Sequence, residues 1–495
     1  MFHTVVLGAT GFIGRALVLG LQGRGHHVIA LARSATRARD LLPAGVDIVD
    51  FTDDAAVRSA IAGADAVINL AGESIAGKRW TKRRKQVLVA SRVAATERLV
   101  DAIAARQRPL PVLVSASATG YYGDRGDEVL DEQSPHGAGF AAELSRVWEA
   151  TARQAAAERI VLARFGIVLG RDGGALEPLL KIARFGVGGP LGDGAQWVSW
   201  IHLDDLISAL LLVIEDAHFT GPVVMTAPEP VHQRDLATAL GHAVHRPAVL
   251  RAPRFAVKVA LGEAATLLLG GQRVLPRALV AAGFAHRFPT LVAALDDLLE
   301  DDVEIERARP ADLADSQYLR KRRARYTLHA RTEIDAPLSE VFPFFSSPEN
   351  LAALTPPALA FAIDGTPGAM SRDSVIDYTI RVAGVPMTWR TRIERWQPGE
   401  SFVDSQERGP YRSWWHEHRF VERDGKTIME DIVHYAPPLG PLGAIANHLF
   451  VARMLRRVFR YRRGAIRMRF RPLTPLPRHA RLTIGAATSP SSTIV

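Results

Sequence analysis

Three glycines near the start of the chain, Gly8, Gly11 and Gly14, have the spacing of a turn that binds phosphate groups. The apolar run at residues 4–7 predicts a strand, and the amphipathic pattern at residues 15–22 predicts a helix. Between a strand and a helix, such glycines let the backbone approach a pyrophosphate, whose charge lies at the helix N-terminus. The chain therefore begins with a predicted dinucleotide site. An unrelated strand–helix–strand unit with a glycine-rich turn is the alternative.

Arg33 distinguishes between two dinucleotides. It directly follows the second predicted strand, residues 27–32, about 20 positions after the glycines, where the side chain that meets the adenosine ribose is found. An acidic residue there binds a free 2′-hydroxyl, whereas an arginine accommodates a 2′-phosphate. The sequence therefore predicts NADP rather than NAD as the cofactor.

Ser117, Tyr121 and Tyr122 lie at the end of a predicted strand and carry hydroxyls suited to proton transfer. A tyrosine in this role needs a nearby ammonium to lower its pKa, and the usual lysine lies four residues further along a helix. None of the eight tyrosines has a lysine at that offset, and Tyr121 is followed by Arg125 instead. These three residues are the catalytic candidates. The missing lysine argues against ordinary ketone reduction, and packing of the strand end is the alternative role.

The first 165 residues alternate short apolar strands with helices, which predicts an α/β fold with a doubly wound parallel sheet. Strands are expected at residues 47–50, 66–70, 112–117 and 160–164, and helices at residues 85–105 and 141–157. Ligands of such sheets bind beyond the carboxyl ends of the strands, where the candidates above are placed. Glycine is dense at residues 170–194, and residues from about 170 to 305 are expected to form a substrate lobe, which completes a first domain at residues 1–305.

The last third of the chain has a different pattern. Oppositely charged blocks at residues 306–325 predict a charged linker. Residues 326–472 predict an α+β domain, in which antiparallel strands are followed by one long helix at residues 442–469. The strands are expected at residues 326–334, 375–382, 387–394, 401–407, 414–421 and 427–435. The stretch at residues 473–495, rich in Pro, Ser and Thr, is expected to be disordered.

Composition limits the classes of function. The 495 residues contain no cysteine, which excludes disulfides and thiolate chemistry and suits a reducing compartment. No apolar run reaches membrane-spanning length, so we expect a cytoplasmic protein. The net charge of +9 lies entirely after residue 315. Because the basic segments lack interleaved aromatic residues, no nucleic acid partner is expected.

Residues 1–300 resemble the atypical extended short-chain dehydrogenase/reductases, and more closely the YfcH-like NADP-dependent epimerase subfamily. The matching stretches are residues 8–14, 69–73, 79–92, 117–123, 148–149, 164–170, 188–190, 200–205 and 270–276. The resemblance implies a pyrophosphate site of Gly8, Thr10, Gly11, Phe12, Ile13 and Gly14. It also implies that Arg33 binds the 2′-phosphate and that Asp50 and Phe51 flank adenine. Leu70, Ala71 and Gly72 would pass under the ribose, and Arg92 would be a further phosphate contact.

In the wider superfamily, a tyrosine and a lysine follow the serine by about 20 to 30 residues on a helix, the proton-transfer arrangement already considered. Phe140 and Leu144 occupy those places here, and neither can ionise. His202, Asp204 and Asp205 resemble the segment that docks the substrate lobe on the sheet. No third ligand stands at a suitable offset from them, so no metal is expected.

Residues 326–472 resemble the helix-grip superfamily of START-like proteins and polyketide cyclases, which implies a curved sheet around a long helix with an apolar cavity. Its aromatic candidates are Phe342, Phe344, Phe345, Trp389, Trp396, Trp414 and Trp415. The arginines of the long helix are expected mainly on a solvated face, with weak contact to an anionic membrane as the alternative. Two functions follow: an NADP(H)-dependent oxidoreductase or epimerase with an unknown small-molecule substrate, or a non-catalytic NADP-binding sensor or scaffold.

Overall fold

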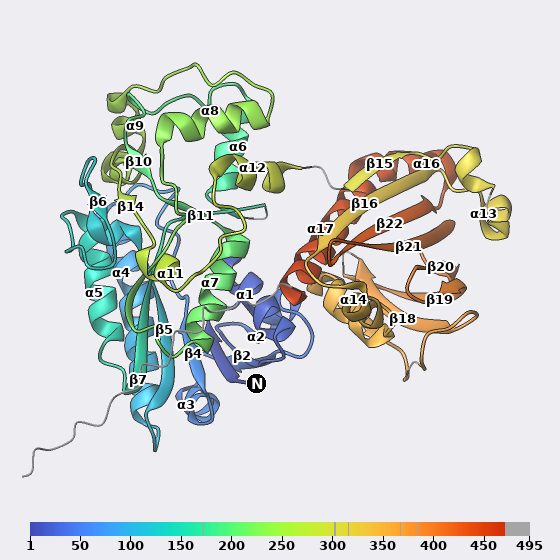
Figure 1. The fold of residues 1–495 in the computed structure, drawn as a ribbon, viewed down its shortest axis with the longest axis horizontal. Helices are drawn as coiled ribbons and strands as arrows, with labels where there is room; N and C mark the ends of the chain where they lie inside the picture. The colour runs from blue at the N-terminus through green and yellow to red at the C-terminus, as the bar shows by residue number, and fades with distance from the viewer. Residues whose placement is uncertain (172, 301–302, 315, 367, 383, 471–495) are drawn as a thin grey trace, which may run out of the picture.

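The computed structural model describes residues 1–171, 173–300, 303–314, 316–366, 368–382 and 384–470, and it shows two domains in contact (Figure 1). The N-terminal domain is built on a parallel seven-stranded sheet with the strand order β12-β7-β5-β4-β1-β2-β3. Its strands are β1 His3–Leu7, β2 His27–Ala32, β3 Asp47–Asp50, β4 Ala66–Asn69, β5 Leu110–Ala118, β7 Ala157–Phe165 and β12 Gly221–Met225. The predicted Rossmann-type sheet is therefore confirmed.

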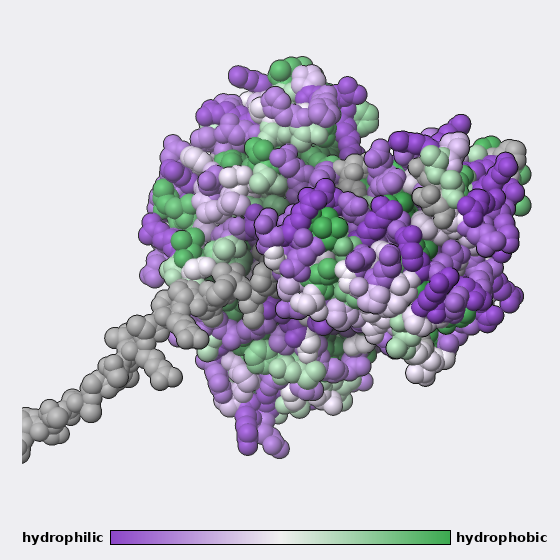
Figure 2. All heavy atoms as spheres, turned by 45° about the vertical axis from the view of Figure 1, so that its right-hand side comes forward, coloured by the Kyte–Doolittle hydropathy of each residue, from purple (hydrophilic) through white to green (hydrophobic). Residues whose placement is uncertain are grey.

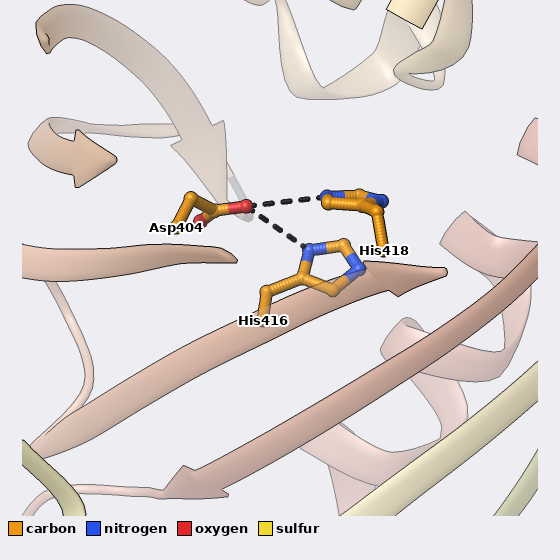
Figure 3. Close-up of side chains that lie close together, drawn as sticks. All are labelled: Asp404, His416 and His418. Atoms are coloured by element: carbon orange, nitrogen blue, oxygen red, sulfur yellow. Dashed lines mark hydrogen bonds and ion pairs between the residues drawn. The ribbon is translucent and has the colours of Figure 1, made fainter. Parts of the chain in front are cut away.

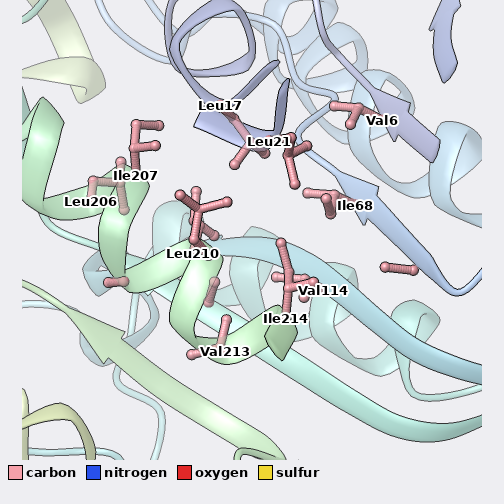
Figure 4. Packing of buried hydrophobic residues seen from close by; sticks show 14 of the residues in the cluster. Val6, Leu17, Leu21, Ile68, Val114, Leu206, Ile207, Leu210, Val213 and Ile214 are labelled. Atoms are coloured by element: carbon pink, nitrogen blue, oxygen red, sulfur yellow. The ribbon is translucent and has the colours of Figure 1, made fainter. Parts of the chain in front are cut away.

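Helices cover both faces of this sheet, as its continuous apolar strands require. They are α1 Phe12–Gly23, α2 Ala35–Leu41, α3 Asp54–Ala62, α4 Lys82–Ala104, α5 Phe140–Ala152 and α7 Leu203–Glu215. Helices α1 and α7 pack together on one face, where Leu17 and Leu21 meet Leu210 (Figure 4). A Cβ atom on Gly20 would lie 2.9 Å from Ile207 Cγ2, so this close approach requires glycine.

The substrate lobe is made of small sheets and short helices, all of which follow β7 in the chain except β6. The sheets pair β6 Val129–Leu130 with β14 Arg273–Val274, β10 Trp197–Val198 with β13 Val231–His232, and β8 Ile167–Gly170 with β9 Gly173–Gly174 and β11 Trp200–His202. The helices are α6 Leu176–Arg184, α8 Gln233–Ala243, α9 Arg254–Leu261, α10 Thr266–Leu269, α11 Arg277–Ala281 and α12 Leu291–Leu299. Asp205 accepts hydrogen bonds from the amides of Arg287 and Phe288, each at 2.9 Å. The segment at residues 202–205 thus docks the lobe, as expected.

The C-terminal domain is an antiparallel eight-stranded sheet with the order β15-β16-β22-β21-β20-β19-β18-β17. Its strands are β15 Val303–Arg307, β16 Tyr326–Ile334, β17 Ala362–Ile363, β18 Val375–Val382, β19 Val385–Gln397, β20 Ser401–Arg408, β21 Ser413–Arg423 and β22 Lys426–Ala436. Its helices are α13 Gln317–Arg322, α14 Leu338–Phe345, α15 Leu351–Leu354, α16 Gly440–Ala446 and α17 Ala452–Arg469, the last two joined by a π-helical turn at Asn447–Val451. The long helix grasped by a sheet is the predicted helix-grip arrangement.

Residues 306–325 do not form the expected linker. Strand β15 pairs with β16 at the edge of the sheet, and Leu319 of α13 packs on Val403 and Trp415. The described part of this segment therefore belongs to the C-terminal domain, because its apolar side chains find a place on the sheet. The expectation for residues 473–495 lies outside the described residues.

Helix α17 lies between the two domains (Figure 1). It packs against α1, and Met468 joins the core of the N-terminal domain. Arg463 and Arg467 are largely buried, and both pair with Asp297 of α12. The expected solvated face is therefore restricted to arginines such as Arg453 and Arg457, which are exposed.

None of the described helices is long and apolar enough to cross a membrane. On the face shown in Figure 2, hydrophobic side chains form separate small groups among hydrophilic ones. The larger apolar clusters lie inside the domains, at the sheet faces described above.

Candidate functional site

The turn between β1 and α1 is closed so tightly that it requires its glycines. Gly8 has a φ of +87°, and a Cβ atom there would lie 2.8 Å from the carbonyl carbon of Leu70. A Cβ atom on Gly14 would lie 2.2 Å from the Gly8 oxygen. The Gly11 amide donates to that same oxygen at 3.0 Å. Larger side chains would push the turn away from the end of β4.

The N-terminus of α1 is left open to an anion. Gly11 is the N-cap and has no side chain to accept from the first amides, and no acidic residue lies in the first turn. The amides of Phe12, Ile13 and Gly14 are therefore available to phosphate oxygens, which the helix dipole also favours. The Phe12 ring turns away into a glycine-rich hairpin, where Cβ atoms on Gly170 or Gly173 would collide with it. The residues present thus fit a pyrophosphate.

Arg33 is exposed at the end of β2, and within the described part of the chain it pairs with no carboxylate. It precedes Ser34, whose side chain caps α2 by accepting from the Arg37 amide at 3.4 Å. The guanidinium therefore stands beside a helix N-terminus with its donors uncommitted. This position suits a phosphate on the ribose.

Asp50 and Phe51 lie at the end of β3, and both side chains already have contacts within the domain. The Asp50 carboxylate accepts from the Thr52 amide and hydroxyl, and these hydrogen bonds hold the pKa of Asp50 below its ordinary value. The Phe51 ring is buried in the core, and Arg98 lies over it at 5.1 Å. Of the two residues predicted to flank adenine, only Asp50 is exposed, while Phe51 is buried in the core.

Leu70, Ala71 and Gly72 follow β4 directly beneath the glycine turn. Arg92 of α4 packs over this strip, since a Cβ atom on Gly72 would lie 3.0 Å from Arg92 Cζ. Arg92 donates to the Glu73 oxygen at 3.0 Å, and burial lowers the pKa of Arg92 to about 10. The predicted ribose strip and phosphate contact thus come together, although they are distant in sequence.

Ser117 and Tyr122 belong to a closed polar network rather than to an open site. Ser117 donates to Glu149 at 2.7 Å, and Glu149 forms a two-pronged ion pair with Arg164 at 2.8 and 2.9 Å. All three side chains are buried. The hydroxyl of Ser117, one of the three catalytic candidates, therefore already donates its proton to a carboxylate.

The Tyr122 hydroxyl is equally committed. It donates to the Asp131 carbonyl at 2.7 Å and accepts from Arg164 at 2.9 Å, while the side chain is fully buried. Burial raises the pKa of Tyr122 well above its ordinary value, despite the nearby Arg164 charge. This geometry favours the packing role for Tyr122 over the predicted proton-transfer role, because a substrate cannot reach the hydroxyl.

Tyr121 is the half-buried member of the three candidates. Its ring stacks on Arg164, with Cζ 3.6 Å from the ring centroid, and contacts the Tyr122 ring edge-on. No hydrogen bond holds its hydroxyl within the described residues. Of the three predicted catalytic residues, Tyr121 is the least buried.

A lysine does reach the helix position where the family tyrosine would stand, but it comes from another helix. Phe140 packs on Trp80 at 5.0 Å, and Lys85 Nζ of α4 lies 5.0 Å from the centre of the Phe140 ring. Lys85 pairs at 2.5 Å with Glu263 of the substrate lobe, in a 3₁₀ turn at Gly262–Ala265. In the sequence, Lys85 is the last residue of a basic run at residues 78–85, and nothing in the spacing of that run indicates a partner so far along the chain.

The C-terminal domain encloses a mainly apolar cavity of about 390 Å³ between its sheet and α17. Four of the seven aromatic candidates line it: Phe344, Phe345, Trp389 and Trp414. Trp415 lies on the other face of β21 against α13, while Phe342 and Trp396 pack in the core. Strand alternation separates Trp414 from Trp415, because successive side chains of a strand point to opposite faces.

Sequence comparison assigns three regions of the chain. Residues 4–224 match the NAD dependent epimerase/dehydratase family. Residues 252–298 match a domain of unknown function (DUF1731), and residues 325–470 match the polyketide cyclase/dehydrase and lipid transport family. The chloroplastic epimerase family protein SDR39U1 homolog of Arabidopsis thaliana is 40% identical over 303 residues, which are 60% of this chain and 86% of that protein. The chain belongs to the epimerase family.

Two further similarities agree with this membership. The epimerase family protein Mb2239 of Mycobacterium bovis is 40% identical over 293 residues, which are 59% of this chain and 95% of that protein. The crystal structure of human epimerase family protein SDR39U1 (isoform 2) with NADPH is 34% identical with a TM-score of 0.54, and it covers 60% of this chain and 99% of that chain. The family and this neighbour support a nicotinamide cofactor in the N-terminal domain.

Proposed function

We propose that this epimerase-family protein is an NADP(H)-dependent oxidoreductase or epimerase whose C-terminal domain binds an apolar ligand. The cofactor assignment rests on the uncapped N-terminus of α1, whose turn packs tightly on Leu70 through Gly8. Arg33 lies exposed at the end of the next strand, β2. The NADPH in the human relative's structure supports the same choice. The apolar cavity supports the second half of the proposal.

Each part of the site has a task in this proposal. The amides of α1 hold the pyrophosphate, and Arg33 binds the 2′-phosphate. A bound nicotinamide would donate or accept a hydride. Tyr121 and the Lys85–Glu263 pair are the groups proposed to exchange protons with a substrate. Lys85 lies against Phe140, and Tyr121 is half-buried, whereas Tyr122 is fully buried and hydrogen-bonded. The lobe residue Glu263 thereby links substrate binding to the position of Lys85.

The direct test separates binding from turnover. Calorimetric titration of the full chain should give at least tenfold tighter binding of NADPH than of NADH. Deuterium-labelled NADPH should then exchange label with a panel of nucleotide sugars and apolar carbonyl compounds. Equal affinity for the two cofactors would overturn the NADP assignment, and absence of exchange across the panel would overturn the enzyme assignment.

A non-catalytic sensor is the second candidate, and the contact between α1 and α17 favours it. Leu19 of α1 packs against the core of the C-terminal domain, and Arg469 of α17 donates to the Gly23 oxygen. The helix proposed to hold the pyrophosphate therefore touches the helix that covers the cavity. Under this reading, Tyr121→Phe and Lys85→Met leave biological activity intact, whereas Arg33→Glu abolishes it.

The cavity mouth carries a further proposed contact, with an anionic membrane. Leu439 and Leu442 line the cavity yet are 76% and 67% exposed, and Ile445 and Phe450 extend the apolar rim. The exposed Arg453 on the following turn adds positive charge for anionic headgroups. Binding to anionic vesicles should fall with added salt and with Leu442→Ser. Equal binding to neutral vesicles, or none to either, would remove this candidate.

A further inference from the structure

Four ionisable side chains meet on the cavity face of the C-terminal sheet. Asp404 of β20 is directly opposite His416 of β21, and His418 follows two residues later on the same face. Asp431 of β22 is opposite His418. Because side chains alternate along a strand, this register gathers all four on one face. Asp404, His416 and His418 line the cavity, whereas Asp431 lies behind them.

Both histidines point a nitrogen at the same oxygen of Asp404 (Figure 3). His416 Nδ1 lies 3.5 Å from Asp404 Oδ2, and His418 Nε2 lies 3.3 Å from it. The three donor atoms are all within 4.8 Å of one another. Two ligands held at about 2.0–2.1 Å by one tetrahedral metal ion are separated by about 3.3–3.4 Å. The two histidine–Asp404 separations are close to that value.

Asp431 holds the opposite nitrogen of each ring. Its Oδ1 atom lies 3.0 Å from His416 Nε2 and 2.8 Å from His418 Nδ1. A neutral imidazole carries one N–H, so two rings that donate to Asp431 both turn unprotonated nitrogens toward Asp404. Two lone pairs facing a carboxylate oxygen repel one another, and a cation between them converts that repulsion into coordination. Histidines oriented by a carboxylate behind them are the usual support of a metal site.

The charges leave room for a cation. Arg462 of α17 also lines the cavity, but its ion pair is with Asp431, 3.7 Å from Oδ1, and it lies 3.4 Å from His418 Nδ1, the nitrogen that faces Asp431. No lysine or arginine of the described residues pairs with Asp404. One carboxylate of this buried group therefore lacks a positive partner.

We propose that Asp404, His416 and His418 bind one divalent transition-metal ion in the wall of the cavity. Two histidines and a carboxylate suit Zn²⁺ or Fe²⁺ and leave coordination positions open. Those positions face the aromatic cavity, so an apolar ligand carrying a carbonyl, enolate or phenolate oxygen can complete the coordination. The site is independent of the nicotinamide site and gives the second domain its own chemistry.

Metal uptake by the full chain tests the proposal. The purified protein is stripped with a chelator and dialysed against Zn²⁺, and separately against Fe²⁺ without oxygen, in the presence of a competing chelator. The expected result is one ion per chain. X-ray absorption of the Zn²⁺-loaded protein should show two imidazole ligands.

Variants locate the ion. His416→Gln and His418→Gln should each weaken uptake by at least about 100-fold, and Asp431→Asn by about 10- to 100-fold. His434→Gln is the matched control. His434 of β22 is buried like His416 and His418, but it bonds Thr327 on the sheet face that points away from the cavity. NADPH affinity and melting temperature show whether each variant is folded. Two results would overturn the site: uptake below about a tenth of an ion per chain, or equal uptake by a folded His416→Gln/His418→Gln double variant. Either result would mean that these residues form only a hydrogen-bonded histidine–aspartate network.

Discussion

Arg467 of the C-terminal helix α17 donates to Asp297 of the substrate lobe at 2.6 Å, across the contact between the two domains. Arg463 approaches the same carboxylate at 3.2 Å, and His202 Nε2 lies 3.4 Å away on the other side. Asp297 therefore connects three elements that are far apart in sequence: the lobe-docking segment, the last helix of the lobe and the helix over the cavity.

The first prediction concerns pH. Burial opposes ionisation of Asp297, but His202, Arg467 and Arg463 outweigh it and hold the pKa of Asp297 far below its ordinary value. A lowered pKa in the folded state adds stability above the unfolded value of about 3.9, and this stability is lost as the pH falls further. Asp297→Asn should therefore destabilise the protein at pH 7, with a difference from wild type that shrinks below about pH 4.

Urea unfolding at several pH values measures this difference. Asp296→Asn is the matched control, since Asp296 is exposed on the same helix turn. A difference between wild type and Asp297→Asn that persists undiminished in acid would contradict the ion-pair account.

The second prediction concerns cofactor choice. Arg33→Glu should weaken NADPH binding at least tenfold, about 1.4 kcal/mol, because it replaces the partner of the 2′-phosphate with a like charge. NADH binding should not weaken, since it lacks that phosphate. Arg39→Glu, an exposed arginine further along α2, is the charge control for calorimetry. Parallel losses for both cofactors would show that Arg33 does not recognise the phosphate.

The third prediction separates the two tyrosines. Tyr121→Phe should lower kcat at least tenfold without changing NADPH affinity, because Tyr121 is the proposed proton-transfer group and its hydroxyl makes no hydrogen bond within the described residues. Tyr122→Phe should leave kcat unchanged but lower the free energy of unfolding by about 1 kcal/mol, because it loses bonds to Asp131 and Arg164. Steady-state kinetics and urea unfolding provide the two readouts. A catalytic defect in folded Tyr122→Phe would restore it as the proton donor.

The fourth prediction concerns the buried ion pair between Glu149 of α5 and Arg164 of β7. Glu149→Gln leaves Arg164 charged and buried, so unfolding should become easier by about 3–5 kcal/mol. Glu143→Gln breaks the exposed Glu143–Arg146 pair on the same helix and should cost less than about 1 kcal/mol. Equal effects of the two substitutions in urea unfolding would contradict the central role of the Ser117–Glu149–Arg164 network.

The fifth prediction links the two ligand sites. If α1 and α17 respond together, saturating NADPH should change the affinity of an apolar fluorescent probe for the cavity. Thermodynamic linkage requires the probe to change NADPH affinity by the same factor. Arg469→Ala removes the bond to Gly23 and should reduce that factor toward one. A coupling factor of one in wild type would rule out communication through this contact.

The sequence alone determined the elements that depend on neighbours along the chain. The glycine turn, the alternating strands and the long final helix follow from local spacing, and strands such as Tyr326–Ile334 were predicted to the residue. The sequence also indicates that Gly8 and Arg33 lie close together, because each follows a strand and parallel strands bring their carboxyl ends to the same edge of the sheet. Expectations based on local pattern failed at residues 306–325, where distant strands supplied partners for an otherwise charged segment.

Only the tertiary structure decided which side chains meet. Burial and hydrogen bonds closed Ser117 and Tyr122 into a network with Glu149 and Arg164, and no spacing in the sequence indicates that pairing. The pattern His-Glu-His at residues 416–418 placed two histidines on one strand face, yet only strand register brought Asp404 and Asp431 to either side of them. Local physics thus fixed the cofactor turn, while long-range packing selected the groups that are available for chemistry.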